Sequence, residues 1–312
     1  MYKVYVIIVT YNGAKWIDKC FGSLEKSTQQ LHTIVIDNGS TDNTPDIIRK
    51  HYPEVEVIEP NENLGFGRAN NIGLKRVLED QADFAFLLNQ DAWVNEDTVE
   101  KLIDFSVKNT DYGILSPIHL NGDGSKIDPK FGAALLRHNN QFLNDLYFDK
   151  KQLCYDTKYV NAAIWLLPLK TLEDIGGFND DYFMYGEDSD YIMRVLYHKK
   201  KIGVLSNCHG YHARDNHHYK KLLFFKNLKF QTEEWYHWSY EQYTMLNKNA
   251  LQGLWAAIYK VNINNVKKIY LKDLSGFIGS NLGFIKFLFK IRTATNVKRI
   301  MAKDSRRQFI EN

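Results

Sequence analysis

The sequence has little cysteine, no internal repeat and no low-complexity run. Its three cysteines, Cys20, Cys154 and Cys208, lie far apart in a chain of 312 residues. An odd number at such spacing argues against a disulfide framework and against a zinc site with paired ligands, so a reducing cytosol suits the chain. The first residues, MYKVYVIIVTYNG, have a short apolar run without a small-residue cleavage site. They predict a first β-strand and argue against a signal peptide.

A long hydrophobic run is also missing. The segment GFIGSNLGFIKFLFKIR, at 276–292, has about sixteen mostly apolar residues, whereas a helix that spans a bilayer needs roughly 20. On a helical wheel its glycines and lysines gather on one side and leave Phe, Ile and Leu on the other. This pattern fits a helix that lies in a membrane interface, and it also fits a helix that packs on the body of the protein.

The charged residues are divided unevenly along the chain. Apolar residues make up 44% of it, which is ample material for a large core and argues against a disordered protein. Residues 1–215 have 23 Lys or Arg against 31 Asp or Glu, whereas residues 216–312 have 17 against 6. The basic end predicts contact with nucleic acid or with an anionic membrane, and a solvated helical surface is the alternative.

Strand-like and helix-like segments alternate over the first 117 residues, as in a parallel sheet with crossover helices. The expected strands are 4–10, 33–37, 55–59, 84–89 and 112–117, and the expected helices lie near 14–27, 44–51, 66–79 and 96–108. Strands that are apolar throughout need a sheet covered on both faces. We therefore predict an α/β domain over 1–215, with a mostly parallel central sheet, and a basic, mainly helical region over 216–312.

Polar residues follow the first, second and fourth of these strands. The segments are Thr10-Tyr11-Asn12-Gly13, DNGSTDNT at 37–44 and NQDAW at 89–93. Ligands of open α/β sheets bind outside the carboxyl ends of the strands, so these tips predict a cleft rich in oxygen acceptors. Turn and cap chemistry explains residues 40–44, whereas Asp37 still belongs to an apolar strand and is a candidate ligand contact.

The segment NENLGFGRANNIG, at 61–73, has two glycines between a strand and a helix. The spacing of a dinucleotide-binding loop fails because Asn occupies position 70 and the segment follows the third strand. A dehydrogenase is therefore not indicated. Arg68, near the expected helix start, is a candidate anion contact.

Three acids crowd into FMYGEDSDYIMRV, at 183–195. Glu187 suits a helix N-terminus, and Asp190 suits an i,i+4 pair with Arg194. Asp188 lies four and seven positions before Ile192 and Val195, on the face that we expect to point inward. A carboxylate aimed at a core or a cleft is costly unless it has a partner or a function.

Taken together, these segments resemble the family 2 glycosyltransferases of the GT-A fold. The resemblance rests on VTYNG, VIDNGSTDNT, NLGFGRANNIG, LLNQDAWV and GGFNDDYFMYGEDSDYIMRV, which follow the family order from residue 4 to about 195. It covers roughly the first two thirds of the chain and leaves the C-terminal third unexplained. The residues that it implies in binding a nucleotide-sugar are Thr10, Asn12, Asp37, Arg68, Asn89 and Gln90.

The resemblance also implies a divalent metal, Mg²⁺ or Mn²⁺. Asp91 matches the metal ligand of the family's DxD motif, in which Asn89 replaces the first Asp of the motif. Downstream, CHGYHARD resembles a histidine segment at a strand end, and His212 is the candidate second contact. His209 and His217 are rivals, and a surface histidine is the alternative for each of them.

Asp188 matches the family's catalytic base, with Glu187 beside it. The resemblance implies an inverting transfer from a UDP- or dTDP-sugar to a glycan or lipid-linked acceptor in cell-surface polysaccharide synthesis, with a rhamnosyltransferase-like activity. The alternatives are a nucleotidyltransferase on a related fold and a non-catalytic glycan- or membrane-binding protein. We expect a cytoplasmic protein without a nucleic-acid partner, peripheral at the inner face of the plasma membrane or assembled as a homo-oligomer.

Overall fold

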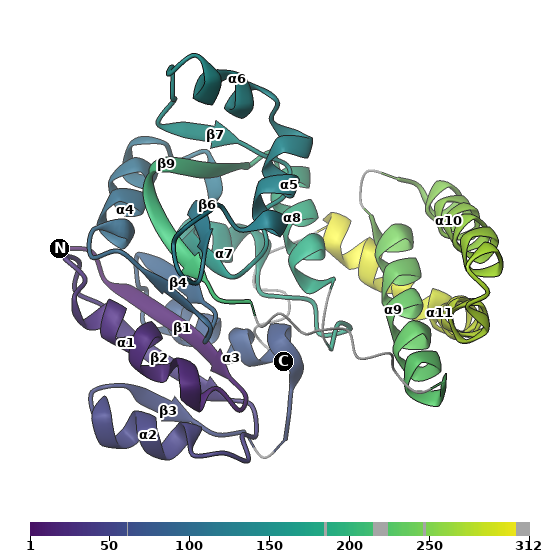
Figure 1. Ribbon diagram of the computed structural model, residues 1–312, viewed down its shortest axis with the longest axis horizontal. Coiled ribbons are helices and arrows are strands. Elements are labelled where there is room, and N and C mark those ends of the chain that lie inside the picture. The colour runs from purple at the N-terminus through teal and green to yellow at the C-terminus, as the bar shows by residue number, and fades with distance from the viewer. Residues whose placement is uncertain (61, 184–185, 215–223, 246–247, 304–312) are drawn as a thin grey trace.

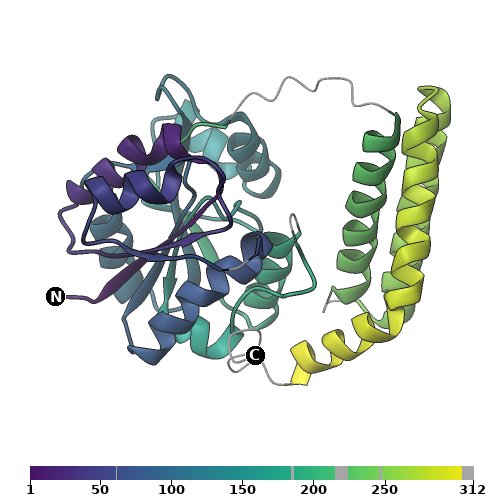
Figure 2. The same ribbon diagram turned by 90° about the horizontal axis from the view of Figure 1, so that it is seen from below.

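The computed structural model describes residues 1–60, 62–183, 186–214, 224–245 and 248–303. These residues form a nine-stranded sheet with helices on both faces, and a bundle of long helices lies beside it (Figures 1 and 2). The strands are β1 (Val4–Thr10), β2 (His32–Asp37), β3 (Glu56–Ile58), β4 (Phe84–Leu88), β5 (Ala92–Val94), β6 (Tyr112–Asn121), β7 (Cys154–Asp156), β8 (Ile164–Pro168) and β9 (Lys201–His212).

The helices predicted in the N-terminal part are present close to their expected bounds. A short 3-10 turn, η1 (Ala14–Trp16), precedes the first of them. The helices are α1 (Ile17–Glu25), α2 (Thr44–His51), α3 (Gly65–Glu79), α4 (Thr98–Lys108), α5 (Pro129–His138), α6 (Gln141–Tyr147), α7 (Leu169–Ile175), α8 (Glu187–Tyr197), α9 (Phe224–Thr244), α10 (Ala250–Tyr270) and α11 (Leu274–Lys303).

The sheet is parallel in its N-terminal half and mixed beyond it. Strands β3, β2, β1 and β4 are neighbours in that order, and their parallel pairing was predicted. Strand β8 is antiparallel to both β4 and β6, and β5 and β7 are antiparallel to β9. Strand β8 begins beside the carboxyl end of β4, where the Asn89 N–H donates to the Ala163 carbonyl oxygen at 2.9 Å, so it runs in the opposite direction to β4. The expectation of a mostly parallel sheet thus holds for the first half only.

Two apolar layers cover the two faces of the sheet. Along β1, Tyr5 and Ile7 join the layer that packs on α3, α7 and α8, whereas Val4, Val6 and Ile8 join the layer under α1, α2 and α4. Alternate residues of a strand point to opposite faces, so a strand covered on both sides must be apolar throughout. This double cover explains why the sequence pattern located these strands.

Helices α9, α10 and α11 form the bundle beside the sheet (Figure 2). A Cβ at Gly279 would lie 2.6 Å from the Cβ of Gln231, and one at Gly283 would lie 2.4 Å from the carbonyl oxygen of Thr232. The glycine side of α11 is therefore the side that packs on α9. Its other side leaves Ile285 47% and Phe289 85% exposed. The segment 276–292 is thus packed on one side and apolar and exposed on the other.

Within the described residues, Leu274–Lys298 is a helix long and apolar enough to cross a membrane, and 33% of its most apolar window is buried. Core helices of water-soluble proteins have the same length and composition, so this property alone assigns no membrane span. The boundary predicted at 215 falls on residues 215–223, which lie outside the described residues, as does His217.

A tyrosine from the loop between α7 and α8 joins the bundle to the sheet domain. Tyr182 is fully buried, and its ring centroid lies 5.6 Å from that of Tyr240 and 5.8 Å from that of His237. The Tyr240 hydroxyl also donates a hydrogen bond to the carboxylate of Asp181. The bundle therefore packs directly on the loop that leads into α8.

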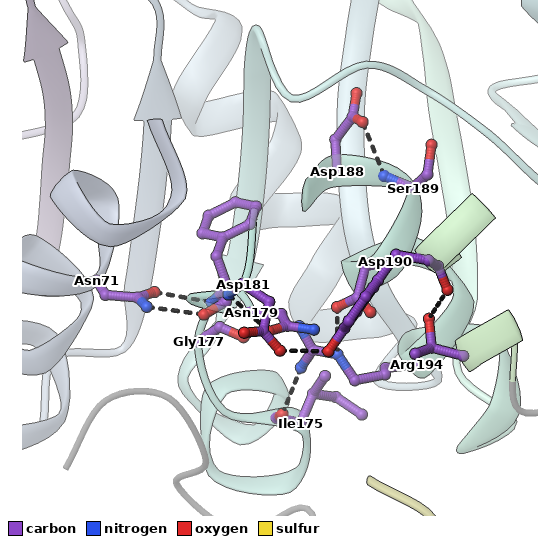
Figure 3. Close-up of polar contacts among 12 residues, drawn as sticks. Asn71, Ile175, Gly177, Asn179, Asp181, Asp188, Ser189, Asp190 and Arg194 are labelled. Carbon is purple, nitrogen blue, oxygen red and sulfur yellow. Dashed lines mark hydrogen bonds and ion pairs between the residues drawn. The ribbon is translucent and has the colours of Figure 1, made fainter. Parts of the chain in front are cut away.

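A buried ion pair holds the other end of the same loop. Arg194 Nε donates to Asp190 Oδ2 at 2.9 Å, and both residues are at most 1% exposed. The two terminal nitrogens of Arg194 donate to the carbonyl oxygens of Ile175 and Gly177, each at 2.8 Å (Figure 3). The predicted i,i+4 pair is confirmed, but it is a core contact and not a surface one.

We expect Asp190→Asn to destabilise the fold by about 3–5 kcal/mol, because it removes the buried negative charge that accepts from Arg194 Nε. Asp97→Asn is the matched control, since Asp97 forms an i,i+4 pair with Lys101 in which the side chains are 45% and 36% exposed. An exposed pair of this kind contributes less than about 1 kcal/mol. Urea denaturation measures both variants, and an equal loss in the two would contradict the structural role of the Asp190–Arg194 pair.

Candidate active site

The tips of β1 and β2 bring two of the predicted donor-binding residues together. Thr10 and Asp37 are register partners, and Thr10 Oγ1 donates to Asp37 Oδ1 at 2.8 Å. Ser40 adds its backbone N–H to Oδ2 at 2.8 Å and its hydroxyl to Oδ1 at 2.6 Å. Because Asp37 is only 2% exposed, these donors fix the carboxylate at the carboxyl edge of the sheet.

Asn12 and Gln90 connect neighbouring tips. Asn12 has φ 50, its side-chain oxygen accepts from the Thr41 N–H at 2.8 Å, and its own N–H donates to Ser40 Oγ at 2.9 Å. Gln90 accepts from the Tyr11 N–H at 2.9 Å and donates to the Tyr11 carbonyl oxygen at 3.1 Å. The tips of β1, β2 and β4 therefore form one connected surface, as the strand-end pattern predicted.

Asp91 and His212 meet at the next position along this edge. Ala92 and His212 pair across β5 and β9, and Asp91 Oδ1 lies 3.4 Å from His212 Nε2. His212 is 5% exposed, and its Nδ1 has no hydrogen-bond partner in the described residues. The part of the chain that the structure describes contains no group of three or more acidic, histidine or cysteine side chains arranged to hold a metal.

The Asp91–His212 pair nevertheless fits a metal that is shared with a substrate. Mg²⁺ and Mn²⁺ are commonly held by one or two carboxylates together with phosphate oxygens, and imidazole also suits Mn²⁺. Two protein ligands side by side would leave the remaining positions of such an ion to a diphosphate and to water. Asn89, in place of an acid, has its side-chain oxygen buried without a partner among the described residues.

Arg68 points at protein and not at the open edge of the sheet. Its Nε and Nη2 donate to the Asp180 carbonyl oxygen at 3.0 Å and 2.8 Å, which ties the first turn of α3 to the loop before α8. Two further sets of side-chain hydrogen bonds were not predicted from the sequence. Asn71 exchanges side-chain bonds with the backbone of Phe178, and Asn38 bonds to the backbone of residues 64 and 65.

A glycine lets the loop before α8 lie against the start of α3. Gly65 has φ 78, and a Cβ at this position would lie 1.9 Å from the Phe183 carbonyl oxygen. The neighbouring Phe66 N–H donates to that same oxygen at 3.2 Å. Gly65 and Gly67 thus allow close packing between the start of α3 and the residues before and at the start of α8, and the Gly-x-Gly spacing was the signal that could have revealed it.

The three acids of α8 differ from the prediction. Glu187 is 7% exposed and Asp190 is 0% exposed, whereas Asp188 is only half-buried. The expectation that Asp188 is the one inward carboxylate is wrong, because α8 is covered on two sides. Its apolar residues pack on the sheet, and residues 175–178 cover the face that was expected to meet solvent.

Asp188 instead points away from the ion pair of its own helix (Figure 3). Its Oδ2 accepts a hydrogen bond from the Tyr159 hydroxyl at 2.8 Å. Burial raises the pKa of Asp188, and the bond from Tyr159 opposes that rise. Burial and the neighbouring Asp188 charge together raise the pKa of Glu187 to about 8. A half-buried carboxylate beside a neutral glutamic acid has the accessibility and the raised basicity that a general base needs.

The site as a whole is an edge of the sheet rich in hydrogen-bond-accepting oxygens, with the Asp188 carboxylate at one end. A comparison with protein-family models matches residues 5–162, about half of the chain, to Glycosyl transferase family 2. The chain belongs to glycosyl transferase family 2. The resemblance inferred from the sequence is thereby confirmed, and the family favours a glycosyltransferase over a nucleotidyltransferase or a non-catalytic binding protein.

Two curated relatives of this glycosyltransferase are rhamnosyltransferases by name. N-acetylglucosaminyl-diphospho-decaprenol L-rhamnosyltransferase from Mycobacterium tuberculosis is 24% identical over 209 residues, which are 59% of this chain and 67% of the relative. Rhamnosyltransferase WbbL from Escherichia coli is 23% identical over 259 residues, which cover 79% of this chain and 96% of the relative. These likenesses confirm a rhamnosyltransferase-like member of the family.

Solved structures confirm the GT-A fold. TarS 1–349 of S. aureus in complex with UDP-GlcNAc has a TM-score of 0.59 at 17% identity, with 99% of this chain and 90% of that chain covered. The mannosyltransferase PcManGT from Pyrobaculum calidifontis, in complex with GDP-Man and Mn²⁺, has a TM-score of 0.56 at 17% identity, with 96% and 85% covered. At this identity the likeness concerns the fold, and the roles of individual residues stay predictions.

The raised pKa of Glu187 gives a pH-dependent stability. An unfolded Glu ionises near its ordinary pKa of 4.5, whereas folded Glu187 stays protonated up to about 8. The contribution of Glu187 to stability therefore falls as the pH rises between these two values, because only the unfolded state releases the proton. Glu187→Gln does not titrate, so we expect its free energy of unfolding to gain on wild type across this window.

Denaturant titrations from below pH 4.5 to above pH 8 measure the difference. Glu96→Gln, at an exposed glutamate between β5 and α4, is the control and is expected to follow the wild-type profile. A constant difference between wild type and Glu187→Gln at every pH would refute the raised pKa.

Proposed function

We propose that the chain is an inverting glycosyltransferase that moves a sugar from a UDP- or dTDP-sugar to a hydroxyl of a cell-surface glycan or a lipid-linked acceptor. The observation that carries the proposal is the position of Asp188, half-buried at the start of α8 and bonded to Tyr159. The donor base and ribose lie at Thr10, Asn12 and Asp37, where the strand tips are already joined. The names of the rhamnosyltransferase relatives support a deoxyhexose donor.

In the proposed reaction, the acceptor oxygen attacks the anomeric carbon from the face opposite the diphosphate. Asp188 takes the proton of the acceptor hydroxyl as the new bond forms and the bond to the diphosphate breaks. Glu187 is protonated near neutral pH, so it adds no second negative charge beside the base. Asp91 and His212 would hold a Mg²⁺ or Mn²⁺ ion, whose charge would stabilise the leaving nucleoside diphosphate.

Asp188→Asn is expected to lower turnover at least ~100-fold, because general bases contribute about 10²–10⁴ to the rate. Donor binding should remain close to wild type, since Asp188 lies on the acceptor side. Initial rates with UDP- and dTDP-sugars and a thermal-shift titration with the same donors measure the two effects. Turnover within tenfold of wild type would remove Asp188 from the role of base.

Asp91→Asn is the matched variant on the donor side, and it exchanges the same functional group. We expect it to weaken the stabilisation by donor plus Mn²⁺ and to leave stabilisation by donor in EDTA unchanged. Identical Mn²⁺ dependence in wild type and Asp91→Asn would exclude Asp91 as a metal ligand.

We further propose that the bundle places the enzyme on the cytoplasmic face of an anionic membrane. Helix α10 packs on α9 at Gly253, buries Ala257 and Val261 on the same side, and leaves its opposite side uncovered. The apolar residues on the uncovered side are Leu251, Trp255, Tyr259, Ile263, Val266, Ile269 and Tyr270, each at least 50% exposed. Residues 250–303 contain ten Lys or Arg against one Asp.

An anionic bilayer is the occupant that matches both properties of this face. Interfacial helices bury an apolar side among the lipid headgroups, and lysines beside it attract acidic lipids. Trp and Tyr are the aromatic residues that favour the headgroup level of a bilayer. A water-soluble protein surface with so many exposed apolar residues is otherwise an unusual arrangement.

The triple change of Trp255, Tyr259 and Val266 to Ser is expected to lower binding to phosphatidylglycerol vesicles at least ~10-fold, since each buried apolar side chain contributes about 1.5–3 kcal/mol. Co-sedimentation measures the bound fraction. Tyr147→Ser, at a tyrosine of α6 that is 81% exposed, is the control and should bind as wild type does. Equal binding by the triple variant would refute this face as the membrane surface.

A further inference from the structure

A groove of about 650 Å³ lies between α5 and α8, and Met245, just after α9, also lines it. The residues of α5 in its wall are Lys130, Ala133, Ala134, Arg137 and His138, and those of α8 are Ser189, Ile192, Met193, Leu196 and Tyr197. Both sets repeat at i, i+3, i+4, i+7 and i+8, so each helix presents one continuous face. The groove is therefore lined by one face of α5 and one face of α8.

One wall of the groove is cationic. Lys130 and Arg137 of α5 and Lys158, before β8, line it and are exposed. Its lining residues include no Asp or Glu, although residues 1–215 have more acids than bases. Within the described part of the chain, none of these three cations forms an ion pair. Burial lowers the pKa of His138, and the charges of Arg137 and Lys158 lower it further, so positive potential gathers here.

The other wall is apolar. Ile192, Met193 and Leu196 of α8 face the groove, opposite Ala133 and Ala134 of α5. Small alanines on one side and long aliphatic side chains on the other leave a channel with an apolar floor. Contact between such a floor and an alkyl chain is favourable, because it removes apolar surface from water.

Two residues that contact the proposed base line the groove. Tyr159 and Ser189 line it, and they are the direct neighbours of Asp188, since Tyr159 donates to Asp188 Oδ2 at 2.8 Å and the Ser189 N–H donates to Oδ1 at 2.7 Å. The first turn of α5 is held in place by Asp128, which accepts from the Phe131 N–H and from Arg214 Nε, both at 2.8 Å. The cationic wall is thus anchored to the end of β9, close to His212.

We propose that this groove binds the acceptor, and that the acceptor is a sugar joined through a phosphate or diphosphate to a long apolar alcohol. This inference rests on the proposed glycosyl transfer. The cations bind the phosphate, the apolar wall covers the first part of the alcohol chain, and the sugar hydroxyl lies at Asp188. A neutral glycan would leave the cations without a partner, and a phosphate-bearing glycan without lipid would leave the apolar wall uncovered.

Farnesyl diphosphate in EDTA is the probe, and isothermal titration calorimetry on the full chain measures its binding. We expect it to bind at least ~10-fold more tightly than farnesol or inorganic pyrophosphate, which carry only one of its two parts. The double change Arg137→Ala and Lys158→Ala should weaken the binding of farnesyl diphosphate at least ~10-fold relative to wild type, or by about 1.4 kcal/mol. Pyrophosphate or farnesol binding as tightly as the whole probe would overturn the proposal.

Two control variants separate charge from fold. Lys108→Ala removes a cation from the last turn of α4, as Arg137→Ala does from α5, and should leave binding unchanged. Ala133→Trp fills the groove while it keeps every cation, and should abolish binding. Unchanged affinity in Ala133→Trp, or an equal loss in Lys108→Ala, would overturn the assignment.

Competition with UDP distinguishes this groove from the donor site. We expect saturating UDP in EDTA to leave the affinity for farnesyl diphosphate unchanged, and displacement by UDP would place the probe at the donor site and refute the groove. A thermal-shift screen with UDP- and dTDP-sugars is independent of the groove. Donor binding without farnesyl diphosphate binding would overturn this inference alone, whereas the reverse would overturn the proposed donor.

Discussion

The buried ion pair of Arg194 and Asp190 is the contact on which the arrangement of the site depends. By binding the carbonyl oxygens of Ile175 and Gly177, the guanidinium fixes the loop between α7 and α8 to the helix that follows it. The same loop is held by α3 on one side and by the bundle on the other, so its conformation is determined from three directions. A buried ion pair contributes little to stability compared with apolar packing, but it allows few alternative geometries. Here that restriction sets where α8 begins and therefore where Asp188 lies.

Much of the fold could be predicted because the sheet is covered on both faces. Strands buried twice must be apolar throughout, and this is why the first strands and their crossover helices were found with nearly correct bounds. The direction of β8 could not be predicted, because nothing local distinguishes a strand entered from the carboxyl edge from one entered by a crossover. The strand tips were located for the same reason as the strands, and the joined side chains of Thr10, Asp37 and Asn12 followed from parallel register.

The acids of α8 show the limit of periodicity. A helical wheel assumes one buried side and one wet side, but α8 is covered by the sheet and by residues 175–178, so Glu187 and Asp190 are more buried than Asp188. The groove was equally hidden from the sequence. The cations of α5 and the aliphatic residues of α8 are more than fifty positions apart in the chain, and only tertiary packing places them on facing walls. The regular spacing within each helix was visible in the sequence, but the fact that these two helices face each other was not.

The burial of Tyr182 has a consequence for how such an enzyme can be divided. Its ring belongs by sequence to the loop before α8 and by packing to the core of the bundle, together with Tyr236, Tyr240 and Phe287. Cutting the chain after the last strand would strip this tyrosine of its cover and release Asp181 from Tyr240. The bundle is therefore not an interchangeable module. A chimera that exchanges it between homologous enzymes would have to carry the matching residues 181 and 182 across as well.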